Sequence, residues 1–320
     1  MSQSVFLTGA TGFVGGAVMR RLVTDDVRVT AAVRDGSKAA CGDVDVVRFD
    51  TFEDVNWHSS LAGVDAVVHC AARVHVMSDT EVDPLAAFRK VNVEGTLNLA
   101  RQAAQAGVRR FVFISSIKVN GEGTRPGQPY TADDQCAPSD AYGVSKLEAE
   151  QGLLALAART SMEIVIIRPV LVYGPGVKAN FLNMMRWLDK GIPLPFGAID
   201  NRRSLVALDN LVDLIITAIN HPAAANQTFL VSDGDDLSTT QLLRSTALAL
   251  GKSARLLPVP AWMLSTAARL VGKDALSQRL CGSLQVDIQK TRTLLQWAPP
   301  VSVNDALKAV AIHYKSDKQQ

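Results

Sequence analysis

The sequence predicts an α/β fold built on a doubly wound parallel sheet, followed by a smaller and mostly helical lobe. Two observations lead to this prediction. Short apolar, β-branched runs alternate with longer helical patterns through the first half of the 320 residues, which is typical of βαβ units in a parallel sheet covered on both faces. A glycine-rich string, TGATGFVGG at residues 8–16, directly follows the first of these runs. Ligands of such folds bind at the carboxyl ends of the strands, so we expect the functional residues there.

Each element of the first half is predicted from its own pattern. Apolar runs of strand length occur at residues 4–8, 27–33, 44–49, 65–70, 110–114 and 163–167. Helical patterns lie between them, near residues 13–24, 84–106 and 140–159. The second helix is expected to end at Gly107, because glycine readily adopts the positive φ of a helix C′ position.

The second half of the chain has a different organisation. After RPVLVYGPG at residues 168–176 the alternation breaks down and prolines become frequent. One return strand is expected near residues 228–232. We therefore predict a first domain of residues 1–167 with return segments near residues 204–232, and a second, mostly helical lobe of residues 168–320.

The composition is that of a soluble globular enzyme. Hydrophobic residues make up 48% of the chain and charged residues 20%. The 33 Lys and Arg residues against 31 Asp and Glu leave a net charge of only +2, with no block of like charge, so no nucleic-acid partner is expected. The four cysteines form no CxxC pair, which favours reduced thiols in the cytoplasm and predicts neither a disulfide framework nor a bound metal.

Neither a targeting segment nor a membrane-spanning segment is predicted. The N-terminus runs almost directly into SVFLTGATG, without the basic and apolar regions of a signal peptide. No apolar run is long enough to cross a bilayer. The nearest feature to a membrane contact is PAWMLSTAARLVG at residues 260–272, which we expect to form an amphipathic helix that packs on its own protein.

The glycine string predicts a dinucleotide site of the Rossmann type. Gly9, Gly12 and Gly15 lie between a predicted strand and a predicted helix, which is the context that such a site requires. The glycines allow a tight turn and let backbone N–H groups approach a pyrophosphate, whose charge the helix N-terminus favours. The other residues of the loop that we expect at the cofactor are Thr11, Phe13 and Val14.

The end of the second strand distinguishes the two dinucleotides. An acid there favours NAD because it accepts hydrogen bonds from ribose hydroxyls, whereas an arginine pairs with the 2′-phosphate of NADP. In AAVRDGSK, Val33 stands where the acid is expected, Arg34 follows, and Lys38 comes one turn later. The prediction is therefore NADP(H). NAD(H) stays open, because Asp35 would take the place of the acid if the strand ended later.

The chain as a whole resembles the extended short-chain dehydrogenase/reductases, a family of nucleotide-sugar epimerases, dehydratases and 4-keto reductases. The motifs that carry the resemblance are TGATGFVG (8–15), Asp50 after the third strand, HCAA (69–72), NVEGT (92–96), FISS (113–116), YGVSK (142–146), RPVLVYGPG (168–176) and RSLVALDNLVD (203–213). The resemblance implies that Asp50, Ala71 and Ala72 lie at the cofactor with the glycine loop. Asn92 matches the helix asparagine of the family, for which a positional role at the same site is expected.

The motif YGVSK implies the catalytic groups. In the family, the tyrosine hydroxyl exchanges a proton with the substrate oxygen while hydride moves to or from nicotinamide C4, which assigns this role to Tyr142. Lys146 would hold the nicotinamide ribose and lower the pKa of Tyr142, since a neighbouring ammonium favours the phenolate. Ser116 takes the position of the hydroxyl residue that hydrogen-bonds the reacting oxygen.

Departures from the family pattern narrow the reaction. Dehydratases carry an acid pair directly after the hydroxyl residue, but this chain has Ile117 and Lys118 there, so dehydration is not expected. Lys118 either reaches the substrate or is solvated. Asn120 replaces the tyrosine of the usual VYG, and Leu171 replaces an asparagine, which leaves the contacts near the sugar and diphosphate open.

The resemblance also implies a nucleotide-diphosphate site in the C-terminal lobe. Asn180 and Phe181 resemble the position from which relatives hydrogen-bond the nucleotide-sugar, and Arg203 matches their diphosphate-binding arginine. A guanidinium suits a diphosphate through its bidentate geometry, although Arg202 and Arg203 could also form a solvated turn. The pocket for the base would involve PLPFG at residues 193–197.

We predict from these residues an NADPH-dependent reductase of a UDP-sugar, with a UDP-4-keto-6-deoxy-N-acetylhexosamine as the type of substrate and O-antigen or lipopolysaccharide synthesis as the setting. Arg34 agrees with an exchangeable NADPH, and the dehydratase acids are not needed. The alternative is an NAD-dependent 4-epimerase of a UDP-hexose or UDP-N-acetylhexosamine, against which Val33 counts.

Two further possibilities are weaker. A non-catalytic dinucleotide sensor is disfavoured because Tyr142 and Lys146 are both present. A steroid-like or flavonoid-like ketone is disfavoured as the substrate, because a neutral substrate has no diphosphate for Arg203 to bind. The resemblance also implies a possible homodimer through the two long helices at residues 84–106 and 140–159.

Overall fold

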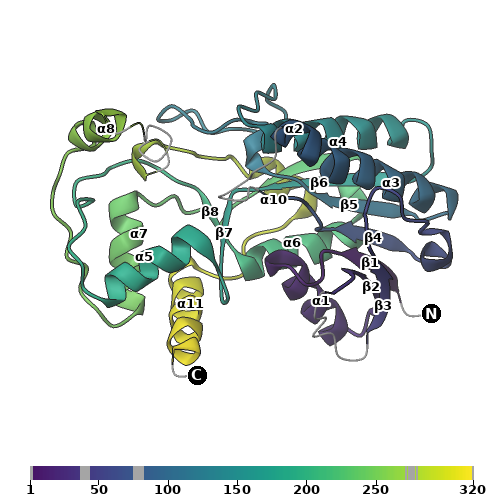
Figure 1. Ribbon diagram of the computed structural model, residues 1–320, viewed down its shortest axis with the longest axis horizontal. Coiled ribbons are helices and arrows are strands. Elements are labelled where there is room, and N and C mark those ends of the chain that lie inside the picture. The colour runs from purple at the N-terminus through teal and green to yellow at the C-terminus, as the bar shows by residue number, and fades with distance from the viewer. Residues whose placement is uncertain are drawn as a thin grey trace.

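The computed structural model, which describes residues 3–36, 44–74, 83–270, 272, 278 and 280–318, is built on one parallel sheet (Figure 1). The strands are β1 (Ser4–Thr8), β2 (Arg28–Arg34), β3 (Asp45–Phe49), β4 (Ala66–His69), β5 (Arg110–Ile114), β6 (Glu163–Pro169) and β9 (Gln227–Val231). Their order in the sheet is β3-β2-β1-β4-β5-β6-β9. The predicted doubly wound α/β fold is thus confirmed. The strand order reverses between β1 and β4, which is where such folds open a ligand crevice.

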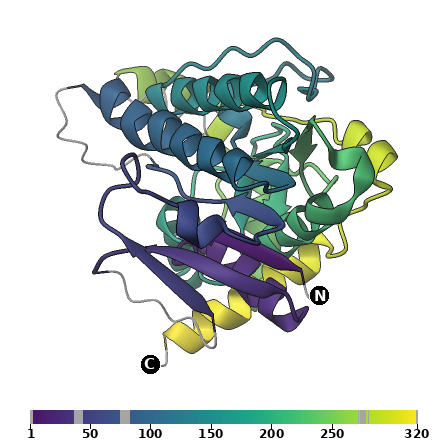
Figure 2. The same cartoon turned by 90° about the vertical axis from the view of Figure 1, so that its right-hand side faces the viewer.

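Helices cover both faces of the sheet (Figures 1 and 2). Those around the sheet are α1 (Phe13–Thr24), α2 (Pro84–Arg89), α3 (Thr96–Gln105), α4 (Ala141–Ala157), α6 (Leu208–Asn220) and α10 (Gln289–Leu295), with the short helices η1 (His58–Leu61), η3 (Ile117–Val119) and η4 (Pro222–Ala224). The buried residues of α1 and α6 form a core with one face of the sheet, and those of α3 and α4 form a core with the other. The sequence alternation predicted this two-sided burial.

The alternation of side chains along β1 shows how a short apolar run serves both cores. Val5 and Leu7 belong to the core under α1 and α6, whereas Phe6 belongs to the core under α3 and α4. Successive side chains of a strand point to opposite faces, so a strand buried on both faces must be apolar at every position. The central residues VFL of the run SVFLT are therefore all apolar.

The region expected as one helix over residues 84–106 is divided in the structure. A π-helical segment, η2 (Lys90–Gly95), separates α2 from α3. The extra residue in this wider turn shifts the register of the helix, and π-helical turns often occur at functional sites. Asn92 lies inside the segment and is buried. The interruption depends on contacts that Asn92 makes far along the chain, so periodicity alone did not predict it.

The C-terminal lobe contains a small sheet that the sequence analysis missed. β7 (Leu171–Tyr173) pairs in parallel with β8 (Leu205–Ala207). The helices of the lobe are α5 (Ala179–Asp189), α7 (Thr239–Ala249), α8 (Ala261–Leu270) and α11 (Val303–Asp317). Its core surrounds Tyr173 and includes residues of α5, α7 and α11. Strands of three residues carry too little pattern to be recognised locally, whereas β9 was predicted as the return strand.

The division into a first domain and a C-terminal lobe stays a prediction. β9 joins the main sheet beside β6, as a return segment of the first domain would. Across the part of the chain described by the structure, no helix combines the length and the hydrophobicity that a bilayer crossing requires.

A buried ion pair ties α4 to the sheet. Glu150 on α4 and Arg168 on β6 are 2% and 5% exposed, and the closest approach of their charged atoms is 2.6 Å. The same carboxylate accepts a hydrogen bond from the Ser115 hydroxyl, and Arg168 also donates to the side-chain oxygen of Asn120 at 3.0 Å. Because both charges are out of water, each needs the other and the surrounding hydrogen bonds.

We expect Glu150→Ala to lower the free energy of unfolding by about 3 to 5 kcal/mol, since it leaves the Arg168 charge buried without a counterion. The matched control is Glu148→Ala on the same helix. Glu148 also pairs with an arginine, Arg89, at 2.6 Å, but both side chains are partly in solvent, so the loss should be below about 1 kcal/mol. Urea unfolding monitored by circular dichroism measures both, and equal losses would contradict the assignment of α4 anchoring to the buried pair.

Candidate active site

The glycine loop connects β1 to α1 in the predicted position. Gly9 has φ +73°, and Gly12 is the N-cap of α1 with no side-chain hydrogen bond to the first turn. A Cβ on Gly9 would lie 2.7 Å from the backbone nitrogen of Ala71, and one on Gly15 would overlap the carbonyl oxygen of Gly9. The glycines thus let the loop approach the end of β4 and let α1 pack against the loop. The first N–H groups of α1 lack a side-chain cap, as a pyrophosphate site requires.

A buried polar chain fixes the end of β4 beside this loop. His69 Nδ1 lies 2.6 Å from the hydroxyl of Thr8, and its Nε2 lies 2.9 Å from the hydroxyl of Thr96. The Thr8 hydroxyl also accepts a hydrogen bond from the backbone N–H of Ala71 at 3.2 Å. Burial lowers the pKa of His69 to about 3, and the charge of Lys146 acts in the same direction, so the imidazole is neutral. This positioning role of the histidine in the motif HCAA was not predicted from the sequence.

Asn92 connects three segments around the predicted nicotinamide site. Its side-chain oxygen accepts a hydrogen bond from the backbone N–H of Arg73 at 2.8 Å, and its amide donates to the Arg73 carbonyl at 3.1 Å. The amide also donates to the Ser145 hydroxyl at 3.0 Å, which in turn donates to the carbonyl of Tyr142 at 2.8 Å. Asn92 therefore holds the loop after β4 against the first turns of α4, which is the positional role expected of it.

Lys146 is a buried ammonium at the centre of the site. Its side chain is 1% exposed, and Nζ lies 3.9 Å from the centre of the Phe113 ring on β5. Among the residues that the structure describes, none accepts a hydrogen bond from this Nζ. Burial lowers the pKa of Lys146 to about 7, against the opposing charges of Glu150 and Cys70. A buried donor without an acceptor fits a cofactor hydroxyl, so the residues present are compatible with a bound nicotinamide ribose.

Tyr142 lies one helical turn before Lys146, but its pKa moves in the direction opposite to our expectation. Burial raises the pKa of Tyr142 to about 12, and the charge of Asp140 raises it further. The phenol ring packs edge-on against Phe88 of α2, with 6.0 Å between ring centres. The predicted lowering by Lys146 is thus absent from the protein alone. The reason is that burial, which was not readable from the sequence, disfavours both the phenolate and the ammonium.

The structure separates the roles of the two adjacent serines. Ser115 is 4% exposed and its hydroxyl donates to the buried carboxylate of Glu150. Ser116 is less buried, and its side-chain oxygen accepts a hydrogen bond from the backbone N–H of Lys118 at 3.3 Å. Ser115 is therefore occupied in the core, which leaves Ser116 as the hydroxyl available to a substrate.

Lys118 is held by acids at the start of α4. Its ammonium contacts the carboxylate of Asp140 and lies 3.1 Å from that of Glu122. Asp140 is also the N-cap of α4 and accepts a hydrogen bond from the backbone N–H of Gly143 at 2.7 Å. A Cβ on Gly143 would lie 2.9 Å from the carbonyl oxygen of Lys118, so this glycine lets η3 come close to α4. These contacts hold η3, whose N-cap is Ser116, against the first turn of α4, which carries Tyr142.

Asn120, which replaces the tyrosine of the family pattern, has a structural role. It is 1% exposed, accepts from Arg168, and donates to the carbonyl of Thr131 at 3.0 Å. Leu171, the other departure, is an exposed residue of β7. The structure thus explains the first substitution as part of the buried network around Arg168.

The predicted adenosine-binding residues lie at the ends of neighbouring strands. Val33 is buried, whereas Arg34 is the last residue of β2 and is exposed. Asp50 follows β3 and is exposed, and Ala72 follows β4. Lys38 lies outside the described residues. Arg34 therefore lies exposed at the carboxyl end of β2, where folds of this class bind the adenosine ribose.

The predicted substrate residues of the lobe occupy different environments. Asn180 is exposed in the first turn of α5, whereas Phe181 is buried and stacks on Tyr173 with 5.6 Å between ring centres. The Phe181 ring therefore belongs to the core of the lobe. Arg203 is partly buried and donates to the carbonyl of Gly282 at 3.1 Å.

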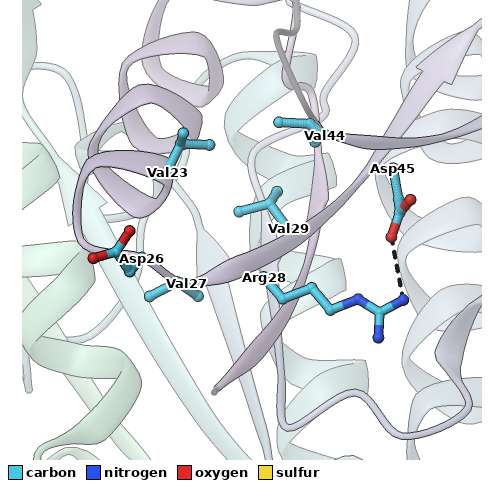
Figure 3. A pocket seen from close by; sticks show the side chains of 7 residues that line it. All are labelled: Val23, Asp26, Val27, Arg28, Val29, Val44 and Asp45. Atoms are coloured by element: carbon cyan, nitrogen blue, oxygen red, sulfur yellow. Dashed lines mark hydrogen bonds and ion pairs between the residues drawn. The ribbon is translucent and has the colours of Figure 1, made fainter.

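Two surface cavities are lined by none of the predicted site residues. One of about 400 Å³ is lined by Val23, Arg28, Val29 and Asp45 among others, at the amino ends of β2 and β3 (Figure 3). The glycine loop follows the carboxyl end of β1, so this cavity is at the opposite edge of the sheet. The other, of about 540 Å³, lies between α5 and α11. The candidate site is therefore defined by its side chains and not by either cavity.

Comparisons with known proteins agree with this arrangement. The model of the NAD dependent epimerase/dehydratase family matches residues 5–232. A UDP-glucose 4-epimerase of Vibrio cholerae is 51% identical over 319 residues, which cover 97% of this chain and 95% of that protein. The N-acetyl-alpha-D-glucosaminyl-diphospho-ditrans,octacis-undecaprenol 4-epimerase of Escherichia coli O157:H7 is 27% identical, with 99% of this chain and 98% of that protein covered. The structure of a UDP-glucose 4-epimerase with UDP-glucose from Thermotoga maritima has a TM-score of 0.79 at 22% identity, covers 99% and 100% of the two chains, and shows the same fold.

The buried ammonium predicts a pH dependence of stability. Because the pKa of Lys146 falls from 10.5 to about 7 on folding, the unfolded chain binds more protons between these values, and the lysine destabilises the fold most at and below about pH 7. In the dinucleotide-free protein, Lys146→Met should raise the free energy of unfolding near pH 7 by on the order of 1 to 4 kcal/mol. The gain should shrink as the pH rises toward 10.

Urea unfolding at several pH values measures the gain. The control is Lys308→Met on α11, whose side chain is 65% exposed, so its effect should not vary over this range. A gain for Lys146→Met that is the same at every pH would show that the ammonium is not destabilised by burial.

Proposed function

Because the chain belongs to the NAD dependent epimerase/dehydratase family, we propose that it is a nicotinamide-dependent enzyme that inverts C4 of a UDP-linked hexose, a UDP-hexose 4-epimerase. The observation that carries the proposal is the pair of Tyr142 and the buried, unsatisfied ammonium of Lys146, in a chain half identical to a UDP-glucose 4-epimerase over nearly its full length.

The proposed reaction starts with removal of a proton from the C4 hydroxyl of the sugar. Tyr142 takes this proton and later returns it to the C4 oxygen, while Ser116 donates a hydrogen bond to the same oxygen. A nicotinamide dinucleotide held by the glycine loop and Lys146 would supply the chemistry of reversible hydride exchange with C4, and epimerisation requires that the hydride return to the opposite face of the sugar. The balance closes without external oxidant or reductant, because the same proton and hydride are returned.

Lys146 would couple cofactor binding to catalysis. In the protein alone, burial raises the pKa of Tyr142 to about 12 and lowers that of Lys146 to about 7. Ribose hydroxyls that accept hydrogen bonds from Nζ would stabilise the ammonium, and a charged Lys146 would then favour the Tyr142 phenolate. The tyrosine would therefore become an effective base only with the dinucleotide in place.

The substrate would lie between the sheet and the C-terminal lobe. Arg203 is the candidate for the diphosphate, and Asn180 and the backbone around Phe181 for the nucleotide-sugar. Dehydration is disfavoured because Ile117 is apolar and buried and Lys118 is a cation, so neither is an acid that could eliminate water.

A second candidate is the NADPH-dependent reduction of a UDP-linked 4-keto sugar, and one observation favours it. Arg34 ends β2 and is exposed, while Val33 before it is buried, so the last strand position offers a cation in place of the acid that NAD prefers. The two candidates use the same Tyr142, Ser116 and Lys146. They differ in whether the cofactor is retained or consumed.

The experiment that tests the proposal identifies the dinucleotide released from purified protein and then follows UDP-glucose by anion-exchange chromatography. The epimerase predicts UDP-galactose without net consumption of added cofactor. Tyr142→Phe should lower the rate roughly 10²- to 10⁴-fold while dinucleotide binding persists, because only the proton transfer is removed. The matched control is Tyr314→Phe on α11, a tyrosine whose hydroxyl lies 3.4 Å from the carboxylate of Asp189 and has no assigned role in proton transfer, so this variant should keep full activity.

Two results would contradict the proposal. Stoichiometric oxidation of NADPH with a UDP-4-keto-6-deoxy-N-acetylhexosamine, without interconversion of UDP-hexoses, would establish the reductase instead. Full epimerase activity in Tyr142→Phe would reject the assigned proton carrier in either case.

A further inference from the structure

Helix α8 presents an apolar face to solvent. No residue of α8 is buried, and Trp262, Met263 and Leu270 are 69%, 46% and 83% exposed. On the surface helix of a soluble protein, the exposed face is normally the polar one. From the sequence we expected this helix to pack on its own protein. The structure corrects that expectation, because Trp262, Met263 and Leu270 point away from the rest of the protein.

The orientation of α8 follows from its helical period. Trp262, Thr266 and Leu270 are four residues apart and therefore lie on one face, and Met263 lies beside them. These residues are all exposed, whereas Leu264 and Ala268, on the other side of the helix, are partly covered. The apolar face is thus a consequence of how the helix is oriented, and not of single scattered residues.

The lobe holds the segments on both sides of α8. Before the helix, the backbone N–H of Leu257 donates to the carbonyl of Leu194 at 2.8 Å, and Gly197 N–H donates to the carbonyl of Leu257 at 2.9 Å. After it, the carbonyl of Gly282 accepts from the side chains of Asn201 at 2.8 Å and Arg203 at 3.1 Å. The lobe therefore binds described segments on both sides of α8, and Figure 1 shows the helix at the edge of the molecule, away from the sheet.

The charge around α8 indicates what covers its apolar face. Residues 251–281 contain five cations and one acid, Asp274, in a chain whose net charge is only +2. The cations of this segment are Lys252, Arg255, Arg269, Lys273 and Arg279, of which Lys252 lies 3.9 Å from the carboxylate of Asp189 on α5. Apolar side chains with an exposed tryptophan, in a segment of mostly positive charge, are the combination with which interfacial helices bind anionic lipid surfaces. A second copy of the same face would bring like charges together.

We propose that α8 docks the substrate lobe on the surface of a membrane that contains anionic lipids. Trp262, Met263 and Leu270 enter the boundary between headgroups and acyl chains, and the net positive charge of the segment attracts the anionic headgroups. The helix lies in the plane of the surface and does not cross the bilayer, since ten residues are too short to span it. The inference does not depend on which sugar reaction the active site performs.

The test is co-sedimentation of the full chain with large unilamellar vesicles. We expect binding to vesicles of phosphatidylcholine with phosphatidylglycerol, weaker binding to phosphatidylcholine alone, and a decrease with added salt. The double variant Trp262→Ser, Leu270→Ser should have an affinity for the anionic vesicles that is lower by about tenfold or more, because two interfacial apolar side chains are lost. The matched control is Leu248→Ser with Ile312→Ser, two leucine- or isoleucine-to-serine changes on α7 and α11 at sites 78% and 69% exposed.

Circular dichroism and the UDP-hexose assay accompany both double variants, and folding and activity should be unchanged, since no substituted residue belongs to the candidate site. Equal binding of the wild type and the α8 variant to anionic vesicles would overturn the proposal, as would a lack of preference for anionic lipid. A concentration-dependent dimer, seen by light scattering in the wild type and lost in the α8 variant, would also overturn it and identify the face as an interface between copies.

Discussion

The site depends on one costly arrangement, the ammonium of Lys146 held between α4 and the sheet, out of water. The Phe113 ring offers it the negative face of an aromatic system, but this replaces only part of the lost hydration. A charge in such a place must be carried by an element that cannot move away. The buried side of α4 accordingly carries three polar residues, Ser145, Lys146 and Glu150, beside the apolar Ala149 and Leu153.

Two of these polar groups, Ser145 and Glu150, have partners that fix the helix. Glu150 joins it to Arg168 of β6, and Ser145 joins it through Asn92 to the loop after β4. At the N-terminus, Asp140 caps the first turn and also contacts Lys118. The same network positions Ser116 and Tyr142, so the stability of α4 and the geometry of the site have one physical origin. Because burial alone shifts the pKa values of Tyr142 and Lys146 unfavourably, the site is complete only when a ligand meets the ammonium.

Local patterns were sufficient for the sheet and for the glycine loop. A strand buried on both faces, such as β5, is apolar at nearly every position, and Gly9, Gly12 and Gly15 stand between a strand and a helix, so both signals lie in consecutive residues. The spacing of Tyr142 and Lys146 on one helix was likewise readable. Features that depend on residues far away in the chain could not be predicted from local patterns. The π-helical turn at Asn92, the pairing of β7 with β8, the buried chain through His69 and the structural use of Asn120 each need a contact from another part of the fold. The prediction that the pKa of Tyr142 is lowered was wrong for the same reason, because burial is a property of the packed molecule and raises this pKa.

The most direct test of the account is a proton NMR time course of UDP-glucose with the purified protein in deuterium oxide, without added cofactor. An enzyme in which Tyr142 exchanges only the hydroxyl proton, while the C4 hydride is removed and returned inside the site, predicts accumulation of UDP-galactose with hydrogen retained at C4. Deuterium at C4 would contradict hydride return, and unchanged UDP-glucose would contradict the proposed epimerisation of this substrate.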